Sequence, residues 1–526
     1  MTQLYSLQFL AFLVCSLVAY YAVGRALGRG QWVVLLVASL VFYAASGWQH
    51  LAFVLVTALS VWWLGRKFFS LEEASKEERR ALKDRAQKKE VKARYNRRKW
   101  HWLLAGLVLN LGILSYIKYW NAVLGLFGAN DGPLASRFLL PLGISFYTFQ
   151  SLGYLIDTYN GKYEPEQNPA RFLLFVSYFP QLIQGPINRW DALAGQLFEH
   201  HTLDLDDFRR GVVLFLYGML KKFVMADLLV GVIGACLNSV TTGTPGSVVV
   251  FGILLYSAQQ YGDFSGGIDM VMGVSRLFGI KMAPNFRQPY FATSLADFWR
   301  RWHITLGAWM RDYVFYPFAL RPSMKRLGAW ANEHLGRHLG RTLPACAANL
   351  LVFFLVGLWH GAQAHYIWWG VYNGVVIALA DLCAPAFARM REATGIERHP
   401  ALHRLLAIVR TFVVVNIGWY FDRIETFQGA VQGFANTLAF FRFDLFLPYL
   451  RAYPTTNLTF KLALACVAIL IVFVVSVLRE RGVDVCGWLL RRNVAVRAAA
   501  YFAIIMLVLF SALLLPSGGD FIYANF

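Results

Sequence analysis

Charged residues are scarce in this chain. Asp, Glu, Lys and Arg make up 15% of its 526 residues, whereas about 25% is usual in soluble domains. The six cysteines are scattered and show no C-x-x-C spacing, so we expect neither a disulfide framework nor a metal site. The sequence contains no G-x-S-x-G elbow, no H-E-x-x-H helix and no Walker loop, which argues against the enzyme classes that depend on these motifs. No internal repeat is visible, and this weighs against transporters built from repeated halves.

Apolar sequence dominates instead. Hydrophobic residues make up 57% of the chain, and its mean hydropathy is +0.46. Long apolar stretches lie at residues 4 to 23, 32 to 64, 102 to 127, 137 to 157, 171 to 187, 211 to 235, 247 to 260, 346 to 382, 404 to 421, 458 to 478 and 497 to 516. About 20 residues span a bilayer as a helix, and two of these stretches are long enough for two passes each. We therefore predict an all-α, polytopic membrane protein with about 11 to 13 membrane segments.

Basic residues concentrate in one segment. Between Arg66 and Lys99, fourteen Lys or Arg accompany six Asp or Glu, which leaves a local net charge of +8. The positive-inside rule makes residues 65–101 a basic cytoplasmic loop. The N-terminus then lies outside if residues 32 to 64 form a hairpin broken near Ala45-Ser46-Gly47-Trp48. A solvated helix in contact with anionic membrane lipid accounts best for the charge, and no nucleic-acid recognition motif accompanies it.

Polar residues gather in the middle third of the chain, and we assign residues 259–382 as the catalytic region. Gly266-Gly267, Pro284 and Pro289 interrupt this region and predict short, partly re-entrant helices. Such helices are tolerated at membrane depth when they are buried in protein or line a watery cavity.

Two carboxylates near membrane depth, Asp263 and Asp269, mark the same region. Pairing with Arg276 or Arg287 would account for them, and so would a place near an active site.

A histidine stands inside an apolar run, Asn349-Leu-Leu-Val-Phe-Phe-Leu-Val-Gly-Leu-Trp-His360-Gly361. An ionised side chain at mid-membrane costs roughly 2.5 to 3.5 kcal/mol on insertion scales, so an intramembrane ionisable group is functional by default. The alternative for His360 is a neutral ring that is hydrogen-bonded between helices.

A second histidine ends the segment Asp297-Phe-Trp-Arg-Arg-Trp-His303. We predict a helix that places Trp299, His303 and Gly307 on one stripe and pairs Asp297 with Arg301. An interfacial helix with snorkelling arginines would explain the Trp and Arg content, although it explains the histidine less well.

The two histidines lie 57 residues apart, so they can meet only through the fold. A desolvated imidazole stays neutral and can accept a proton from an alcohol. This chemistry is compatible with two functions, which are base-assisted transfer onto a hydroxyl and proton-coupled transport.

The pair of segments Asp297–His303 and Gly357-Leu-Trp-His-Gly361 resembles the signature of the membrane-bound O-acyltransferase (MBOAT) family. Six blocks in order resemble its bacterial polysaccharide-modifying branch, typified by alginate O-acetyltransferase. The further blocks are Pro141–Gln150, Phe179–Ile187, Asp263-Phe-Ser-Gly266 with Asp269, Pro284-Asn-Phe286 with Arg311-Asp-Tyr313, and the aromatic ending Phe521–Phe526.

This resemblance implies a single membrane domain over residues 1–526, with a central funnel that leads to His360. His303 matches the family's second histidine. The resemblance further implies that the acyl donor arrives from the cytoplasm, with acetyl-CoA as a substrate and no bound cofactor, and that the acceptor hydroxyl arrives from outside. His360 is then the general base, and donors near His303 stabilise the oxyanion or position the acyl group.

Further site residues follow from the matched blocks. We associate substrate binding with Asp263, Asp269, Arg300, Arg301, Trp302, Trp359, Gln150 and Gln184. The arginines would meet anionic donor phosphates, or else they pair with Asp297, Asp312 or lipid headgroups. The tryptophans more often pack than bind substrate, and the amides more often bond helix to helix.

The sequence therefore predicts an acetyltransferase of the bacterial cytoplasmic membrane that modifies a cell-envelope or exported polysaccharide or hands the acetyl group to an extracytoplasmic partner enzyme. Two alternatives stay open. One is D-alanyl transfer from a carrier protein to teichoic acid, and the other is a proton-coupled transporter or flippase.

Overall fold

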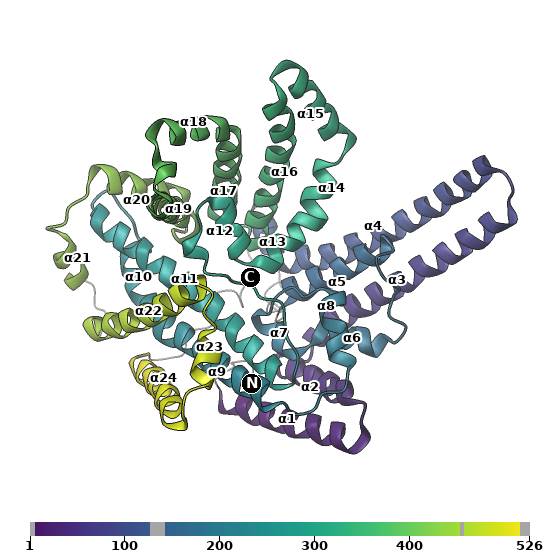
Figure 1. Cartoon of the computed structure of the whole chain (residues 1–526), viewed down its shortest axis with the longest axis horizontal. Coiled ribbons are helices and arrows are strands. Elements are labelled where there is room, and N and C mark those ends of the chain that lie inside the picture. Colours follow the sequence, from purple (N-terminus) through teal and green to yellow (C-terminus); the bar gives the residue numbers. More distant parts are fainter. Residues whose placement is uncertain (1–5, 127–142, 453–456, 516–526) are drawn as a thin grey trace. The chain divides into compact units, whose positions relative to one another are not determined.

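The structure is a computed structural model that describes residues 6–126, 143–452 and 457–515. These residues form helices and no β-strand, apart from an isolated bridge between Phe286 and Trp302 (Figure 1). The predicted all-α fold is confirmed. Pro141 and Leu142 of the first block and the ending Phe521–Phe526 lie outside the described residues.

The chain divides into two compact units. Unit 1 runs up to Val212 and includes Val271–Ala283, and unit 2 consists of Val213–Met270 and the chain from Pro284 onward. The helices of unit 1 are α1 (Leu7–Leu27), α2 (Gln31–Ser46), α3 (His50–Ala81), α4 (Arg85–Leu126), α5 (Ile144–Tyr159), α6 (Pro169–Ser177), α7 (Phe179–Gln184) and α8 (Trp190–Phe198), with parts of α9 (Leu205–Met219) and α11 (Gly246–Leu277). The prediction of a single membrane domain stays a prediction.

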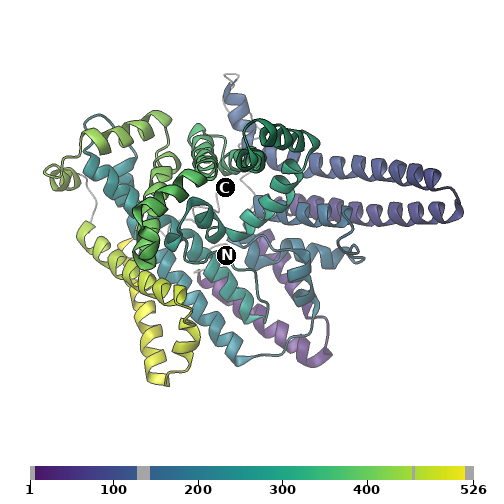
Figure 2. The same ribbon diagram turned by 45° about the horizontal axis from the view of Figure 1, so that its top comes forward.

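The basic segment belongs to a helical hairpin within unit 1. Helices α3 and α4 lie side by side (Figures 1 and 2) and are joined by a turn of three residues. The Asp84 carboxylate accepts a hydrogen bond from the backbone N–H of Ala86, 3.1 Å away, and so caps α4. Glu72 pairs across the hairpin with Lys99 at 3.1 Å. The predicted loop 65–101 is thus largely helical, as the solvated-helix interpretation expected.

Unit 2 contains the predicted catalytic region 259–382 except for Val271–Ala283. Its remaining elements are the π-helical turn η1 (Leu220–Ala226), η2 (Asp227–Leu229), α10 (Val230–Leu237), η3 (Pro289–Phe291), α12 (Leu295–Arg301), α13 (Ile304–Met310), the π-helical turn η4 (Arg311–Phe315), α14 (Tyr316–Ala319), α15 (Pro322–His334), α16 (Arg337–His360), α17 (Ala364–Leu382), α18 (Ala384–Thr394), η5 (Ile396–Arg398), α19 (Pro400–Arg423), α20 (Phe427–Ala439), α21 (Phe446–Ala452), α22 (Leu458–Glu480), α23 (Val485–Leu490) and α24 (Val494–Leu514). The short elements between η3 and α14 confirm the expected interruptions. However, Gly266 and Gly267 do not break α11.

Seven described helices are long and apolar enough to cross a membrane, namely α1, α3, α4, α16, α19, α22 and α24. Helices α17 and α18, which meet at 61°, make an eighth span if they cross together. The sequence-based number was higher because it counted apolar stretches that fold as short pieces. Residues 171 to 187, for example, form α6 and α7 with a bend at Tyr178.

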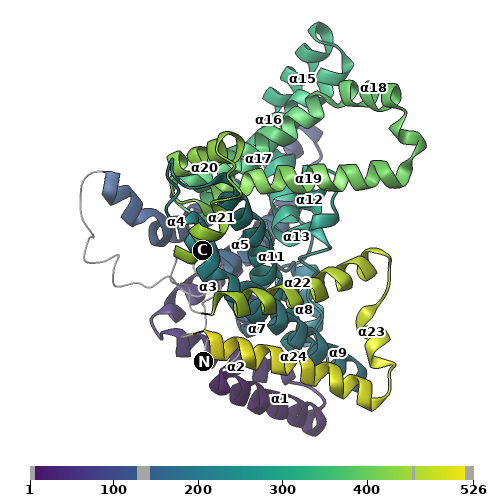
Figure 3. The same ribbon diagram turned by 90° about the vertical axis from the view of Figure 1, so that its left-hand side faces the viewer.

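Helices α16 and α17 form a tight hairpin (Figure 3). His360 is the last residue of α16 and therefore lies at the bend of the hairpin. The two backbones touch at glycines. A Cβ atom on Gly357 would lie 2.5 Å from the carbonyl oxygen of Tyr366, and one on Gly370 would lie 2.3 Å from that of Phe353. Real Cβ atoms do not approach this closely, so the absence of side chains at these positions sets how near α17 lies to the end of α16.

We predict that Gly370→Val destabilises the protein by about 1 to 3 kcal/mol, because the added methyl groups would force the two helices apart. The midpoint of thermal unfolding in detergent measures this effect. Gly231→Val is the matched control, since Gly231 is exposed and has open space around its Cβ position. Equal midpoints for the two variants would contradict the close helix contact.

Candidate active site

His303 lies at a sharp corner between α12 and α13. The Ser294 hydroxyl caps the start of α12 by accepting a hydrogen bond from the Asp297 N–H, 3.1 Å away. The helix then ends, because Trp302 is extended and His303 adopts a left-handed backbone with φ 47° and ψ 52°. The predicted continuous helix from Asp297 to His303 is therefore wrong at its last two residues. A left-handed conformation is uncommon outside glycine and is typical of sites that the surrounding structure constrains.

The segment that holds this corner is centred on Asn285. The Asn285 side-chain oxygen accepts hydrogen bonds from the N–H and hydroxyl of Thr305, at 3.0 and 2.9 Å. Its backbone oxygen accepts from the Ile304 N–H at 3.0 Å, and the Arg287 N–H donates to the Arg301 carbonyl at 2.9 Å. The His303 Nδ1 lies 3.3 Å from the same Asn285 side-chain oxygen. Asn285 therefore sets both the backbone and the ring of His303.

Aromatic rings surround His303, which is 3% exposed. The ring of Phe264, from α11, packs edge-on at 4.8 Å between centroids, and the ring of Trp359 lies at 6.0 Å. Trp302 is buried against Phe286 at 5.1 Å. Because burial disfavours the charged form of an imidazole, this environment favours a neutral ring.

Trp359 connects the two histidines. Its ring lies 4.9 Å from that of His360, and His360 also contacts Trp369 at 4.9 Å and Tyr366 at 5.9 Å. His360 is 5% exposed and ends α16. Two histidines that are distant in sequence thus pack against one tryptophan within unit 2.

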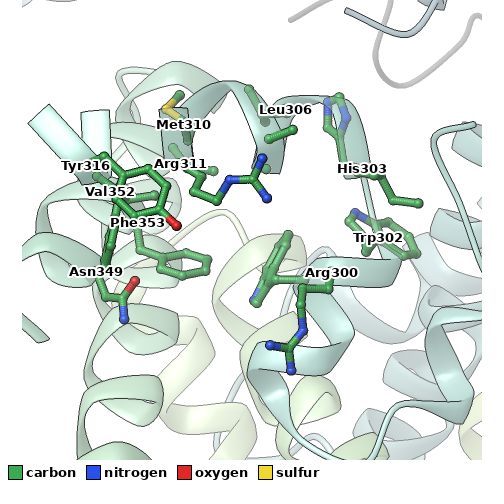
Figure 4. A pocket seen from close by; sticks show the side chains of 16 residues that line it. Arg300, Trp302, His303, Leu306, Met310, Arg311, Tyr316, Asn349, Val352 and Phe353 are labelled. Carbon is green, nitrogen blue, oxygen red and sulfur yellow. The ribbon is translucent and has the colours of Figure 1, made fainter. Parts of the chain in front are cut away.

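A cavity of about 380 Å³ opens beside His303. Its wall includes Trp302, Leu306 and Phe353, and it also carries the two cationic side chains Arg300 and Arg311 (Figure 4). The Arg311 guanidinium bonds Asp312 at 2.9 Å and remains half-exposed. The volume, the apolar walls and the two cations of this cavity suit an anionic ligand that also has an apolar part.

A second cavity, of about 630 Å³, opens beside His360. Its buried floor contains Tyr256, Gln260 and Asp422, and its exposed rim contains Gln363 and Glu425. The Asp422 carboxylate accepts hydrogen bonds from the Tyr256 hydroxyl at 2.7 Å and from the Gln260 amide at 2.9 Å. The two histidines thus face cavities of different chemistry.

The aspartates of the predicted site are engaged with two lysines of the π-helical turn η1. Asp269 pairs with Lys221 at 2.5 Å. Asp263 pairs with Lys222, which also binds Asp227 at 2.9 Å. Pairing with Arg276 or Arg287 was therefore the wrong alternative. These buried ion pairs fix α11 against η1, and α11 carries Phe264 to His303.

The remaining predicted residues divide between two roles. Arg301 is 12% exposed and pairs with Asp297 at 3.1 Å, as expected, and with Glu480 at 2.9 Å, so the exposed Arg300 is the one that reaches a cavity wall. In unit 1, the Gln150 amide donates to the Phe175 carbonyl at 2.7 Å. Both amide atoms of Gln184 are buried without a hydrogen-bond partner among the described residues.

Sequence reasoning missed Lys221, Lys222 and Asp422, and it named Asn285 only as part of the matched block Pro284-Asn-Phe286 without a role. The adjacent lysines, surrounded by Leu, Phe, Val and Met, were visible as charges in an apolar run. Asp422 carried no such signal, because its neighbours in sequence are unremarkable for a membrane protein. No group of three or more His, Cys, Asp or Glu that could hold a metal ion occurs within the described ranges.

Comparison with known proteins agrees with this architecture. Residues 166–331 match the model of the membrane-bound O-acyltransferase family. The chain is 34% identical over 431 residues to the probable alginate O-acetylase AlgI of Pseudomonas aeruginosa, covering 80% of this chain and 71% of that protein. It is 31% identical over 359 residues to the peptidoglycan O-acetyltransferase of Helicobacter pylori (63% of each chain). It is also 29% identical over 285 residues to the teichoic acid D-alanyltransferase of Bacillus subtilis (53% and 67%).

The helical fold with its apolar spans and the buried histidine site define a multi-pass membrane enzyme. The chain belongs to the membrane-bound O-acyltransferase family. It is an O-acyltransferase.

The ion pairs of η1 predict an unequal response to neutralisation. Lys222→Met leaves Asp227 and Asp263 buried without their cation, and breaking a buried pair in this way costs about 3 to 5 kcal/mol. Asp263→Asn leaves Lys222 paired with Asp227 and should cost clearly less. Thermal unfolding of both variants measures the difference. A smaller loss for Lys222→Met than for Asp263→Asn would contradict the assigned pairing.

Proposed function

We propose that the chain transfers an acetyl group from cytoplasmic acetyl-CoA to a hydroxyl of a cell-envelope or exported polysaccharide, directly or through an extracytoplasmic partner enzyme. His360 is the general base, and His303 positions the acyl group. The enzyme resides in the bacterial cytoplasmic membrane, where its basic α3–α4 hairpin contacts anionic lipid on the cytoplasmic side. The observation that carries the proposal is the placement of both histidines against Trp359, each beside its own cavity.

The charges of the two cavities support the assignment of donor and acceptor. Arg300 and Arg311 beside His303 suit the phosphates of acetyl-CoA, because guanidinium groups bind phosphate through several donors. The cavity beside His360 carries the two carboxylates of Asp422 and Glu425 and the single guanidinium of Arg423, an excess of negative charge that suits hydroxyl groups better than phosphates. The donor thus enters on the His303 side and the acceptor on the His360 side.

In the reaction, a neutral His360 takes the proton from the acceptor hydroxyl. The resulting oxygen attacks the thioester carbonyl and forms a carbon–oxygen bond. The carbon–sulfur bond then breaks, coenzyme A leaves as the thiolate and takes up the proton that His360 had accepted, and the ester departs with the acceptor. A hydrogen bond near His303 stabilises the oxyanion of the tetrahedral intermediate.

D-alanyl transfer to teichoic acid is the second candidate, supported by the similarity to the Bacillus subtilis D-alanyltransferase. It differs in donor, because a carrier protein would deliver the acyl group. The two candidates release different acids from the modified polymer, acetate in one case and D-alanine in the other.

We predict that His360→Ala lowers the acetate released by base from cell-surface polymers by at least about 100-fold, since a general base contributes roughly 10² to 10⁴ in rate. Mass analysis of released acids from the native and variant strains measures this loss. His334→Ala, at an exposed histidine on α15, is the control at matched membrane abundance.

The acid that disappears identifies the activity. Loss of D-alanine instead of acetate would replace the first candidate with the second. Unchanged levels of both acids in the His360→Ala strain would refute the assignment of His360 as the base.

A further inference from the structure

The cavity beside His360 has the form of a binding site. Its volume of about 630 Å³ lies within the range of roughly 300 to 1,000 Å³ usual for small-molecule sites. The residues of its floor, Tyr256, Gln259, Gln260 and Asp422, are each between 4% and 7% exposed, whereas Glu425 at the rim is exposed. A ligand entering from the rim therefore meets a buried polar floor next to the proposed base.

Hydrogen-bond acceptors dominate this floor. The side-chain oxygens of Gln259 and Gln260 are buried and have no hydrogen-bond partner among the described residues. Asp422 adds a carboxylate that the Tyr256 hydroxyl and the Gln260 amide hold in place. Buried acceptors left unmatched are costly, so the fitting ligand presents several O–H donors at once.

The charges around the cavity disfavour an anionic ligand. Asp422 and Glu425 both border it. The guanidinium of Arg423, which also borders it, donates to the Asn238 side-chain oxygen 2.6 Å away. The other titratable groups in the wall are His360, His365, Tyr256 and Tyr366. A carboxylate on the ligand would therefore meet two like charges and one opposite charge, that of Arg423, which leaves a net repulsion in a partly desolvated space.

We propose that this cavity is an acceptor site selective for an uncharged sugar, and that it excludes uronic acid residues. The inference rests on the proposed function, because it takes His360 as the base. Several acceptors spread over the floor match the several hydroxyls of a sugar ring better than the single hydroxyl of a serine side chain. The cavity beside His303 carries two arginines, Arg300 and Arg311. This difference in charge directs the anionic donor to the His303 cavity and the neutral acceptor to the His360 cavity.

Three methyl glycosides test the selectivity with the full chain in proteoliposomes and radiolabelled acetyl-CoA. Methyl glucoside and methyl glucuronide differ only in a carboxylate at C6, and methyl xyloside is neutral but lacks C6 altogether. We expect both neutral glycosides to be acetylated and the glucuronide to be acetylated about tenfold less, because of the like charges. Glucuronide acetylation equal to that of the neutral pair would overturn the proposal, and so would preferred acetylation of N-acetylserinamide.

A variant at the rim isolates the charge. Glu425 is exposed, so the Glu425→Gln variant should fold normally, and it should raise the ratio of glucuronide to xyloside acetylation severalfold. Glu392→Gln, at an exposed carboxylate on α18 outside the cavity, is the matched control. An equal effect of the two substitutions would argue against selection by the cavity.

A measurement of glycoside binding that does not depend on acetyl transfer distinguishes this inference from the proposed function. The shift of the thermal unfolding midpoint on adding each glycoside reports binding directly. Shifts with the neutral glycosides alone, together with no acetyl transfer, would support the acceptor site and refute acetyl-CoA as donor. Transfer to all three glycosides alike would support the proposed function and refute the selectivity. No shift and no transfer with any of them would overturn both.

Discussion

A charge buried in a low-dielectric interior must be paired, and this constraint organises the core of unit 2. Lys221 and Lys222 are buried side by side on η1, where a π-helical turn brings both ammonium groups toward carboxylates. Their partners on α11, Asp263 and Asp269, are six residues apart. The two ion pairs therefore fix the position of α11 along its axis and its rotation about that axis. Since α11 also carries Phe264 against His303, the pairs act on the site through the helix rather than by touching substrate.

Two structural features hold the histidines of the site in place. His303 stands at a corner whose unusual backbone is held by Asn285 through hydrogen bonds to the next turn. His360 stands at the bend of a hairpin whose helices touch at glycine. Trp359 packs against both rings. Rigid placement of this kind suits acyl transfer, because the base must lie within hydrogen-bond reach of the acceptor hydroxyl while the acceptor oxygen is held close to the acyl carbon.

Several features followed from sequence because their causes are local. The apolar stretch 32 to 64 breaks within the predicted Ala45–Trp48 segment, where Gly47 ends α2. The Asp297–Arg301 pair forms because residues four apart share a helix face. The His303 corner was not predictable in this way, since the helix predicted from periodicity continued through His303, whereas the interruption is held by Asn285, 18 residues earlier. The partners of Asp263 were missed for the same reason, because Lys222 lies 41 residues away.

By itself, the sequence determined that the chain is a multi-pass helical membrane protein and that two of its histidines, His303 and His360, stand within recognisable motifs. Hydropathy and motifs are properties of consecutive residues. Tertiary structure alone decided that both histidines pack on Trp359, that Arg300 rather than Arg301 borders a cavity, and that Asp422 lies on the floor of the other cavity. The physical reason is that cavities and buried ion pairs arise where helices cross. Which side chains meet there depends on packing between segments that no local pattern connects.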